Sequence, residues 1–136
     1  MRPHSTSPRE IRDLRAVVER DLADSKIALL SDDRRFATAY NAVLQLTKIV
    51  IACEGYRVAG LGHHQTAFQA LEVALGSSVI PFSAYFEQCR RQRNQVDYDM
   101  ANVATSAGAD LLIQKAEEFR ALVEGWIKNH HPHYAA

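Results

Sequence analysis

The stretch FATAYNAVLQLTKIVI, residues 36–51, decides the fold class of this chain. Its large side chains return at steps of three and four residues, the spacing of one face of an α-helix; they are Phe36, Tyr40, Val43, Leu44, Thr47, Val50 and Ile51. The polar run Ser31–Asp33 can cap a helix before this stretch, and Gly55 can stop it afterwards. The pattern predicts one broad, largely apolar helix, the longest and most buried of the fold.

Helical patterns also flank this stretch on both sides. A capping-box sequence at 7–10 begins a first helix. After a glycine-containing loop at 56–62, further helices are predicted at about 63–75 and 81–97, and the last one carries the apolar residues of 111–126. Amphipathic helices with short connections most simply form an all-α, antiparallel up-and-down bundle, here of four to five helices.

Length and charge limit the organisation of the chain. Its 136 residues suffice for one domain with its own core; we expect a helical bundle at 8–129, a disordered N-terminal tail at 1–7 and a solvated C-terminal tail at 130–136. The 16 basic and 16 acidic residues cancel, so any contact with nucleic acid must be local.

The cysteines and the apolar runs indicate a cytoplasmic protein. Cys53 and Cys89 both fall within apolar helical patterns and are expected to be reduced core residues, not nucleophiles. The polar residues 1–7 do not resemble a signal peptide. The longest apolar run, 49–53, is far shorter than the roughly 20 residues that a membrane span needs.

An arginine interrupts the apolar face of the predicted fourth helix. At 100° per residue, four side chains share one face, and Arg93 falls near its middle; the four are Phe82, Tyr85, Phe86 and Cys89. A buried guanidinium must be paired or hydrogen-bonded. Arg93 can snorkel past the end of the core, form an ion pair with Asp97 or Asp99, or lie at a seam between proteins. Alternatively, together with Arg90 and Arg91, it can bind phosphate.

Three segments resemble the HEPN family of small helical bundles. Arg91–Tyr98 (RQRNQVDY) resembles its arginine-based signature, and Ala37–Ala42 (ATAYNA) resembles its second helix, which is rich in aromatic residues and alanine. Gly55–His64 is similar to its glycine-containing loop before the third helix. The resemblance extends from about Arg9 to Trp126.

The resemblance implies a homodimer formed through the fourth helix, with two motifs facing each other across a basic cleft. In active members of the family the cleft is a metal-independent endoribonuclease. The ribose 2′-hydroxyl attacks the phosphate, a histidine transfers protons, and the arginine stabilises the developing charge. Several members are toxins paired with a small nucleotidyltransferase antitoxin, and others bind RNA or serve as scaffolds without catalysis.

The sequence departs from the catalytic pattern at the histidine. Arg93 and Asn94 match the motif, but Tyr98 stands where the histidine is expected, and a phenol with a pKa of about 10 is a poor base at neutral pH. His63 and His64 can supply an imidazole instead, although we expect them to cap or pack at the start of the third helix.

Three functional hypotheses follow from this pattern. The favoured one is a HEPN-like homodimeric module that binds RNA at the degenerate site, of the toxin–antitoxin type, with weak or no cleavage. The second is an active endoribonuclease that uses Tyr98, and the third is a non-catalytic bundle that binds a protein partner. We expect no metal or cofactor, because His130, His131 and His133 lie in the tail and no predicted helix carries the spacing of a metal site.

Overall fold

The all-α class is confirmed. The computed structural model describes residues 1–58, 64–97 and 103–136, with the backbone alone for 95–97. The α-helices in these ranges are α1 (Pro8–Ser25), α2 (Asp32–Cys53), α3 (His64–Leu75), α4 (Ile80–Asp97) and α5 (Ser106–His130). The same ranges contain two 3-10 helices, η1 (Gly76–Val79) and η2 (Pro132–Tyr134). They also contain two short strands, β1 (Arg2–Pro3) and β2 (Tyr56–Arg57).

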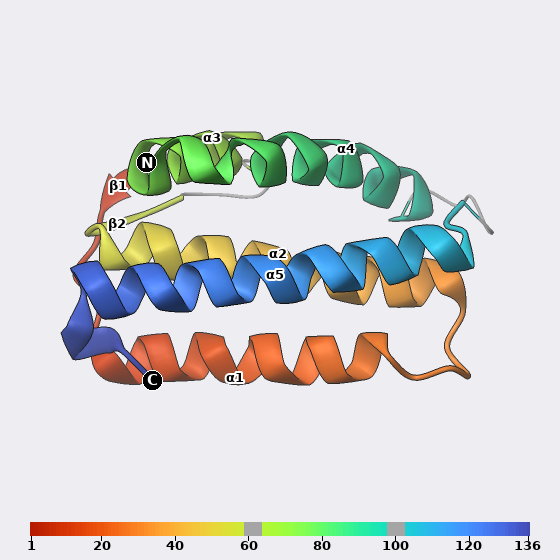
Figure 1. Cartoon of the computed structure of the whole chain (residues 1–136), viewed down its shortest axis with the longest axis horizontal. Helices are drawn as coiled ribbons and strands as arrows, with labels where there is room; N and C mark the ends of the chain where they lie inside the picture. The colour runs from red at the N-terminus through yellow and green to blue at the C-terminus, as the bar shows by residue number, and fades with distance from the viewer. Residues whose placement is uncertain (59–63, 98–102) are drawn as a thin grey trace.

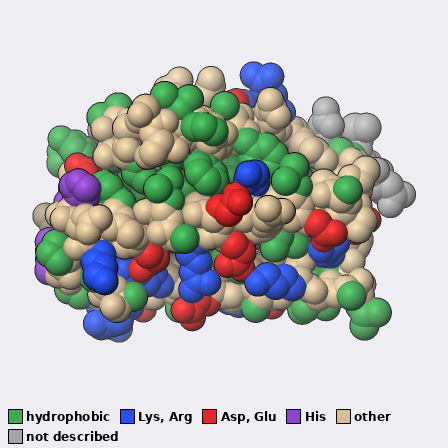
Figure 2. Space-filling model, in the orientation of Figure 1, with side chains coloured by type: hydrophobic (Ala, Val, Ile, Leu, Met, Phe, Trp, Pro, Cys, Tyr) green, Lys and Arg blue, Asp and Glu red, His purple; other side chains and the backbone are tan. Residues whose placement is uncertain are grey.

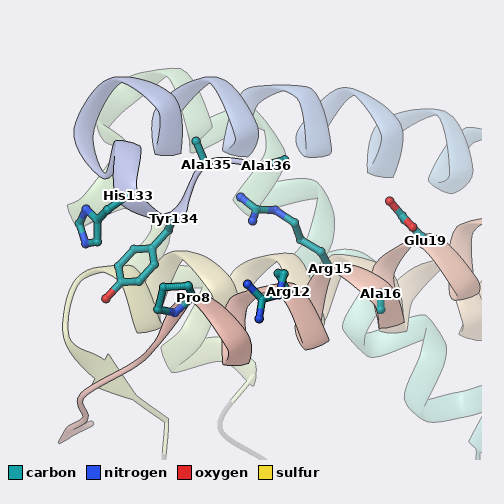
Figure 3. A pocket seen from close by; sticks show the side chains of 9 residues that line it. All are labelled: Pro8, Arg12, Arg15, Ala16, Glu19, His133, Tyr134, Ala135 and Ala136. Carbon is teal, nitrogen blue, oxygen red and sulfur yellow. The ribbon is translucent and has the colours of Figure 1, made fainter.

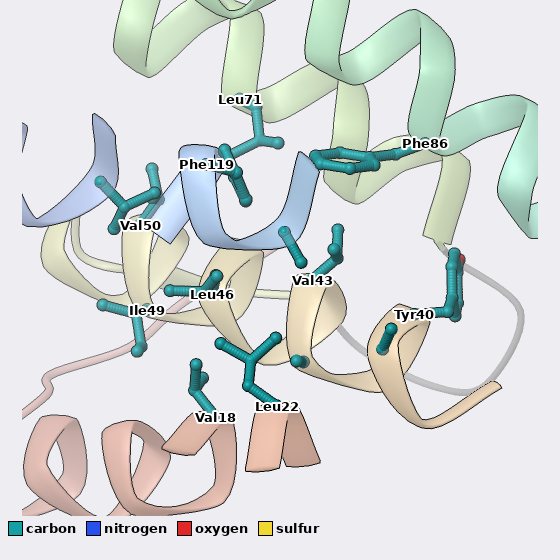
Figure 4. Packing of buried hydrophobic residues seen from close by; sticks show 14 of the residues in the cluster. Val18, Leu22, Tyr40, Val43, Leu46, Ile49, Val50, Leu71, Phe86 and Phe119 are labelled. Atoms are coloured by element: carbon teal, nitrogen blue, oxygen red, sulfur yellow. The ribbon is translucent and has the colours of Figure 1, made fainter. Parts of the chain in front are cut away.

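The helices form three layers (Figure 1). α1 is one outer layer, α2 and α5 lie side by side in the middle, and α3 and α4 form the other outer layer. The central helix α2 is buried as expected, because its apolar positions face both outer layers; Val43, Leu46, Ile49 and Val50 each have 0 or 1% of their surface exposed. Figure 4 shows these side chains between Val18 and Leu22 of α1 and Phe119 of α5. The expectation that α2 is the longest helix is wrong, since α5 has 25 residues and α2 has 22.

The order of helix directions is more complex than a simple up-and-down bundle. Three of the four pairs of helices that follow each other in sequence, such as α3 and α4, are antiparallel (Figure 1), but α2 runs parallel to both α3 and α5. α5 runs parallel to α2, because Asp110 pairs with Arg35 at one end and His131 contacts Glu54 at the other. α3 also runs parallel to α2, because its first residue contacts the N-terminal half of α2, at Tyr40.

Both expected tails contain ordered structure. β1 pairs antiparallel with β2, and the backbone N–H of His4 donates to the carbonyl of Gly55 at 2.8 Å, so residues 1–7 are not the disordered tail that was expected. At the other end, His131 contacts Glu54, and Tyr134 of η2 packs partly buried against the core. The expectation of a fully solvated C-terminal tail is therefore wrong, because His131 and Tyr134 find partners on the bundle.

Two stretches are long and apolar enough to cross a membrane by length and composition alone, Asp32–Cys53 and His64–Asn94. The first is α2, whose apolar window is 72% buried inside the bundle. The second contains α3 and α4, between which the chain reverses direction (Figure 1). α2 is therefore a core helix of the bundle, whereas 28% of the apolar window in the second stretch is buried.

Candidate functional site

Arg93 lies where the sequence predicted, on the core-facing side of α4. Its guanidinium carbon is 5.4 Å from the centre of the Tyr40 ring, and the residue is half-buried. A guanidinium over an aromatic face at this distance makes a cation–π interaction, which orients the group against the ring. The sequence also predicted an ion pair of Arg93 with Asp97 or Asp99. The side chains of these two residues lie outside the part of the chain that the structure describes.

A tyrosine–histidine pair adjoins this arginine. The Tyr40 hydroxyl and His64 Nδ1 are 2.9 Å apart, and the two rings are 5.8 Å apart. Tyr40 is fully buried, and Figure 4 shows it pointing from α2 towards the α3–α4 layer. His64 begins α3 as expected, but its ring is directed into the site. Sequence reasoning missed this pair, because the partners are 24 residues apart and meet only through the direction of α3.

Burial and nearby positive charges keep His64 neutral. Burial lowers the pKa of His64, and the charges of Arg93, Arg90 and Lys48 lower it further, while Glu87 opposes them. Burial also raises the pKa of Tyr40 well above its usual value, so the phenol stays protonated. At neutral pH the pair is thus an uncharged imidazole and an uncharged phenol that share one hydrogen bond beside a cation.

The three predicted phosphate-binding arginines have different surroundings. Arg90 donates through Nε and Nη2 to the Glu87 carboxylate at 2.6–3.0 Å, so it is largely neutralised. The Arg91 side chain is 73% exposed, and its Nε lies 3.8 Å from the same carboxylate. Of the three, Arg93 is the one held against Tyr40, so it is the strongest candidate for a phosphate contact.

Two other predicted residues lie near or beyond the end of the described part of α4. Asn94 is half-buried next to Arg93. Tyr98, the predicted replacement for the histidine, lies outside the described residues, as does His63.

A separate pocket of about 440 Å³ lies on the opposite outer layer, between α1 and the C-terminal residues. Figure 3 shows Tyr134 near Pro8 at the start of α1, with Arg12, Arg15 and Glu19 further along the helix. Arg15 pairs with Glu124 at 3.0 Å, and Glu19 pairs with Arg120 at 3.2 Å. These pairs tie α1 to α5, and none of the pocket residues belongs to the predicted motif.

The other residues considered as metal ligands or nucleophiles are the histidines of the C-terminal tail and the two cysteines. Among the described residues, no group of three or more His, Cys, Asp or Glu side chains is placed to hold a metal ion. His130 stacks on Trp126, with ring centres 6.0 Å apart. Cys53 and Cys89 are free and buried, and burial raises the pKa of each thiol to about 11, so both are unreactive at neutral pH.

Comparisons with known proteins assign no family to this chain. No protein-family model, no curated protein and no solved structure matches it. The resemblance to HEPN domains therefore stays a prediction from short motifs, and any function has to be argued from the site around Arg93.

Proposed function

We propose that this chain is a HEPN-like homodimeric module that binds RNA through the site around Arg93, His64 and Tyr40, with weak or no cleavage. The observation that carries the proposal is the guanidinium of Arg93, held over the Tyr40 ring beside a neutral imidazole. A guanidinium matches the oxygens of a phosphate, and it binds them most strongly where water is partly excluded.

The local electrostatics support an anionic ligand. The chain as a whole has no net charge, but among the described residues Arg93, Arg90 and Lys48 lie close enough to His64 to lower its pKa, and Glu87 opposes them. A phosphate arriving there would be attracted by Arg93 and would not be repelled by His64 or Tyr40.

The proposed dimer uses an apolar strip along α4 and α5. Figure 2 shows hydrophobic side chains gathered between the α3–α4 layer and α5. Phe82 and Tyr85 of α4 pack against the core but stay partly exposed, and Leu111 of α5 is 44% exposed. A second copy that covers this strip would bury apolar area and bring two copies of α4 together, as the HEPN resemblance implies.

A second candidate function is metal-independent RNA cleavage. The observation that favours it is the position of His64, which can act as the base in place of Tyr98. If His64 Nδ1–H donates to the Tyr40 oxygen, Nε2 keeps its lone pair and can take the proton of a ribose 2′-hydroxyl. The 2′-oxygen then attacks phosphorus, and the 5′-oxygen leaves and takes up a proton. The products are a 2′,3′-cyclic phosphate and a 5′-hydroxyl end.

The test compares Arg93→Gln with Arg91→Gln, which removes the same charge from an exposed position on the same helix. Binding of a labelled single-stranded RNA is measured by fluorescence anisotropy at low salt in the presence of EDTA. We expect Arg93→Gln to weaken binding about tenfold or more, and Arg91→Gln to weaken it only slightly, because solvent screens an exposed charge. Circular dichroism verifies that both variants are folded.

The same reactions, resolved on a gel, separate the two candidates. Intact RNA supports a binding module. Cleavage that disappears in both Arg93→Gln and His64→Ala supports the ribonuclease. If the wild-type protein binds no RNA at low salt, both candidates are excluded, and the hypothesis of a partner-binding bundle takes their place.

A further inference from the structure

We infer that the RNA-binding surface continues from Arg93 along α2 to a second contact region beside the β1–β2 ribbon, which would bind the next part of a single strand. This inference rests on the proposed function and extends it to a substrate class, single-stranded RNA of several nucleotides. The second region is called the ribbon pocket below, and the cations that line it are Lys48 and Arg57.

The ribbon pocket is a cavity of about 400 Å³ between α1, α2 and β2. Lys48, Arg57 and Tyr56 form its polar and aromatic wall, and Leu14 and Ile51 contribute to its apolar wall. Lys48 is exposed on α2, and its charge also acts on His64. One lysine thus connects the pocket with the site around Arg93.

Positive charge exceeds negative charge at the ribbon pocket. Arg57 lies directly opposite Arg2 in the antiparallel pair, and like charges in this arrangement repel each other unless an anion screens them. The acidic group that lines the pocket is Glu10, whose carboxylate accepts hydrogen bonds from Thr6 at 2.9 Å and from His4, if Nε2 is protonated, at 2.7 Å. Among the described lining residues, Arg57 and Lys48 therefore share the pocket with one carboxylate that already has hydrogen-bond partners.

Tyr56 provides a surface on which a base can stack. It is 45% exposed, and it lines both the ribbon pocket and a smaller neighbouring cavity of about 220 Å³. The neighbouring cavity has apolar walls that include Met1 and Val73, which are themselves 59% and 89% exposed. An aromatic ring beside cations is the arrangement with which proteins bind single strands, because bases stack while phosphates meet positive charge.

The distance between the two regions sets the length of the strand. Tyr40 lies at the Arg93 site and Ala52 lines the ribbon pocket, and the 12 residues between them rise about 18 Å along α2. Stacked nucleotides rise about 3.4 Å each, so about five of them bridge the two regions. A strand of two or three nucleotides would reach only one region.

The experiment measures anisotropy of labelled oligouridylates of 3 and 12 nucleotides with wild-type protein and with Lys48→Gln, Arg57→Gln and Tyr56→Ala. The control is Arg34→Gln, which removes an exposed charge at the other end of α2. We expect Tyr56→Ala to weaken binding of the 12-mer about fivefold or more. Each charge variant should lower the salt dependence of that binding, by about 0.7 in slope for each phosphate that the variant no longer neutralises.

The outcomes separate this inference from the proposed function. Arg57→Lys should retain the salt dependence that Arg57→Gln reduces, and neither Arg57→Gln nor Tyr56→Ala should change the weaker binding of the 3-mer to the Arg93 site. If Arg93→Gln weakens binding of the 12-mer while the ribbon-pocket variants behave like Arg34→Gln, the inference is wrong and the proposed function stands. If the wild-type protein binds neither oligonucleotide, both are wrong.

Discussion

At the scale of single residues, His64 gives the site a dependence on pH with two opposite effects. Burial and neighbouring cations lower its pKa in the folded chain, whereas in the unfolded chain it stays at about 6.5. The stabilising contribution is therefore complete above the unfolded pKa and is lost as the pH falls through it towards the folded value. We expect the free energy of unfolding to decrease between about pH 7.5 and about pH 5.5, and RNA affinity to increase once the pH falls below the lowered pKa of His64, because the imidazole then becomes a cation.

Urea denaturation of His64→Gln at both pH values tests this prediction. Glutamine can still share a hydrogen bond with Tyr40 but does not titrate. The free energy of unfolding of the variant should therefore depend less on pH than that of the wild type. His133→Gln, at an exposed position, is the matched control. If the free energy of unfolding depends equally on pH in the wild type and in His64→Gln, burial does not lower the pKa of His64 as we infer.

Residue-level prediction succeeded where a single helix carried the signal. The spacing along the fourth helix identified Arg93 as a charge on an apolar face, and the described contacts place it there, against Tyr40. The partners of Arg93 were missed, because Tyr40 and His64 come from two helices whose relative direction is not encoded in either segment. The same spacing grouped the three arginines together, and only the structure shows that Arg90 is bound to Glu87 while Arg93 lies over the Tyr40 ring.

At the scale of elements, an aromatic cluster fixes α4 onto the bundle. Phe86 is fully buried, with ring centres 6.1 Å from Phe68 of α3 and 5.1 Å from Phe119 of α5. Phe86→Ala should lower the free energy of unfolding by about 3–5 kcal/mol, measured by urea denaturation, because it leaves a cavity. Leu29→Ala, at a side chain 98% exposed, should change it by no more than about 0.5 kcal/mol. Comparable decreases in both variants would contradict the cluster's role.

Helix ends were predictable because their signals are local. Ser7 and Ser31 accept hydrogen bonds from the backbone N–H groups of Glu10 and Arg34, at 3.1 and 3.2 Å, as their sequences predicted. Gly55 and Gly76 have positive φ values of 90° and 79° beyond the ends of α2 and α3. The direction of α3 was not predictable, because the ten residues after Cys53 are long enough to begin the next helix at either end of α2.

At the scale of the whole molecule, the assembly state tests the proposed dimer. One chain weighs 15.2 kDa, and light scattering after size-exclusion chromatography should give twice that mass for the wild type. Leu111→Glu places a charge in the apolar strip and should shift the protein to the single-chain mass. Val73→Glu, on the exposed face of α3, should leave the dimer intact. A wild-type protein that stays at the single-chain mass at all concentrations would contradict the dimer.

The burial of both thiols has a practical consequence for such experiments. The chain contains two cysteines, and each is enclosed by the core with its pKa raised to about 11. A maleimide dye would therefore react with a cysteine introduced at an exposed position, such as Arg91→Cys, and leave the native thiols unmodified. Fluorophores attached in this way could report how far apart two protomers hold their fourth helices, without any need to replace Cys53 or Cys89.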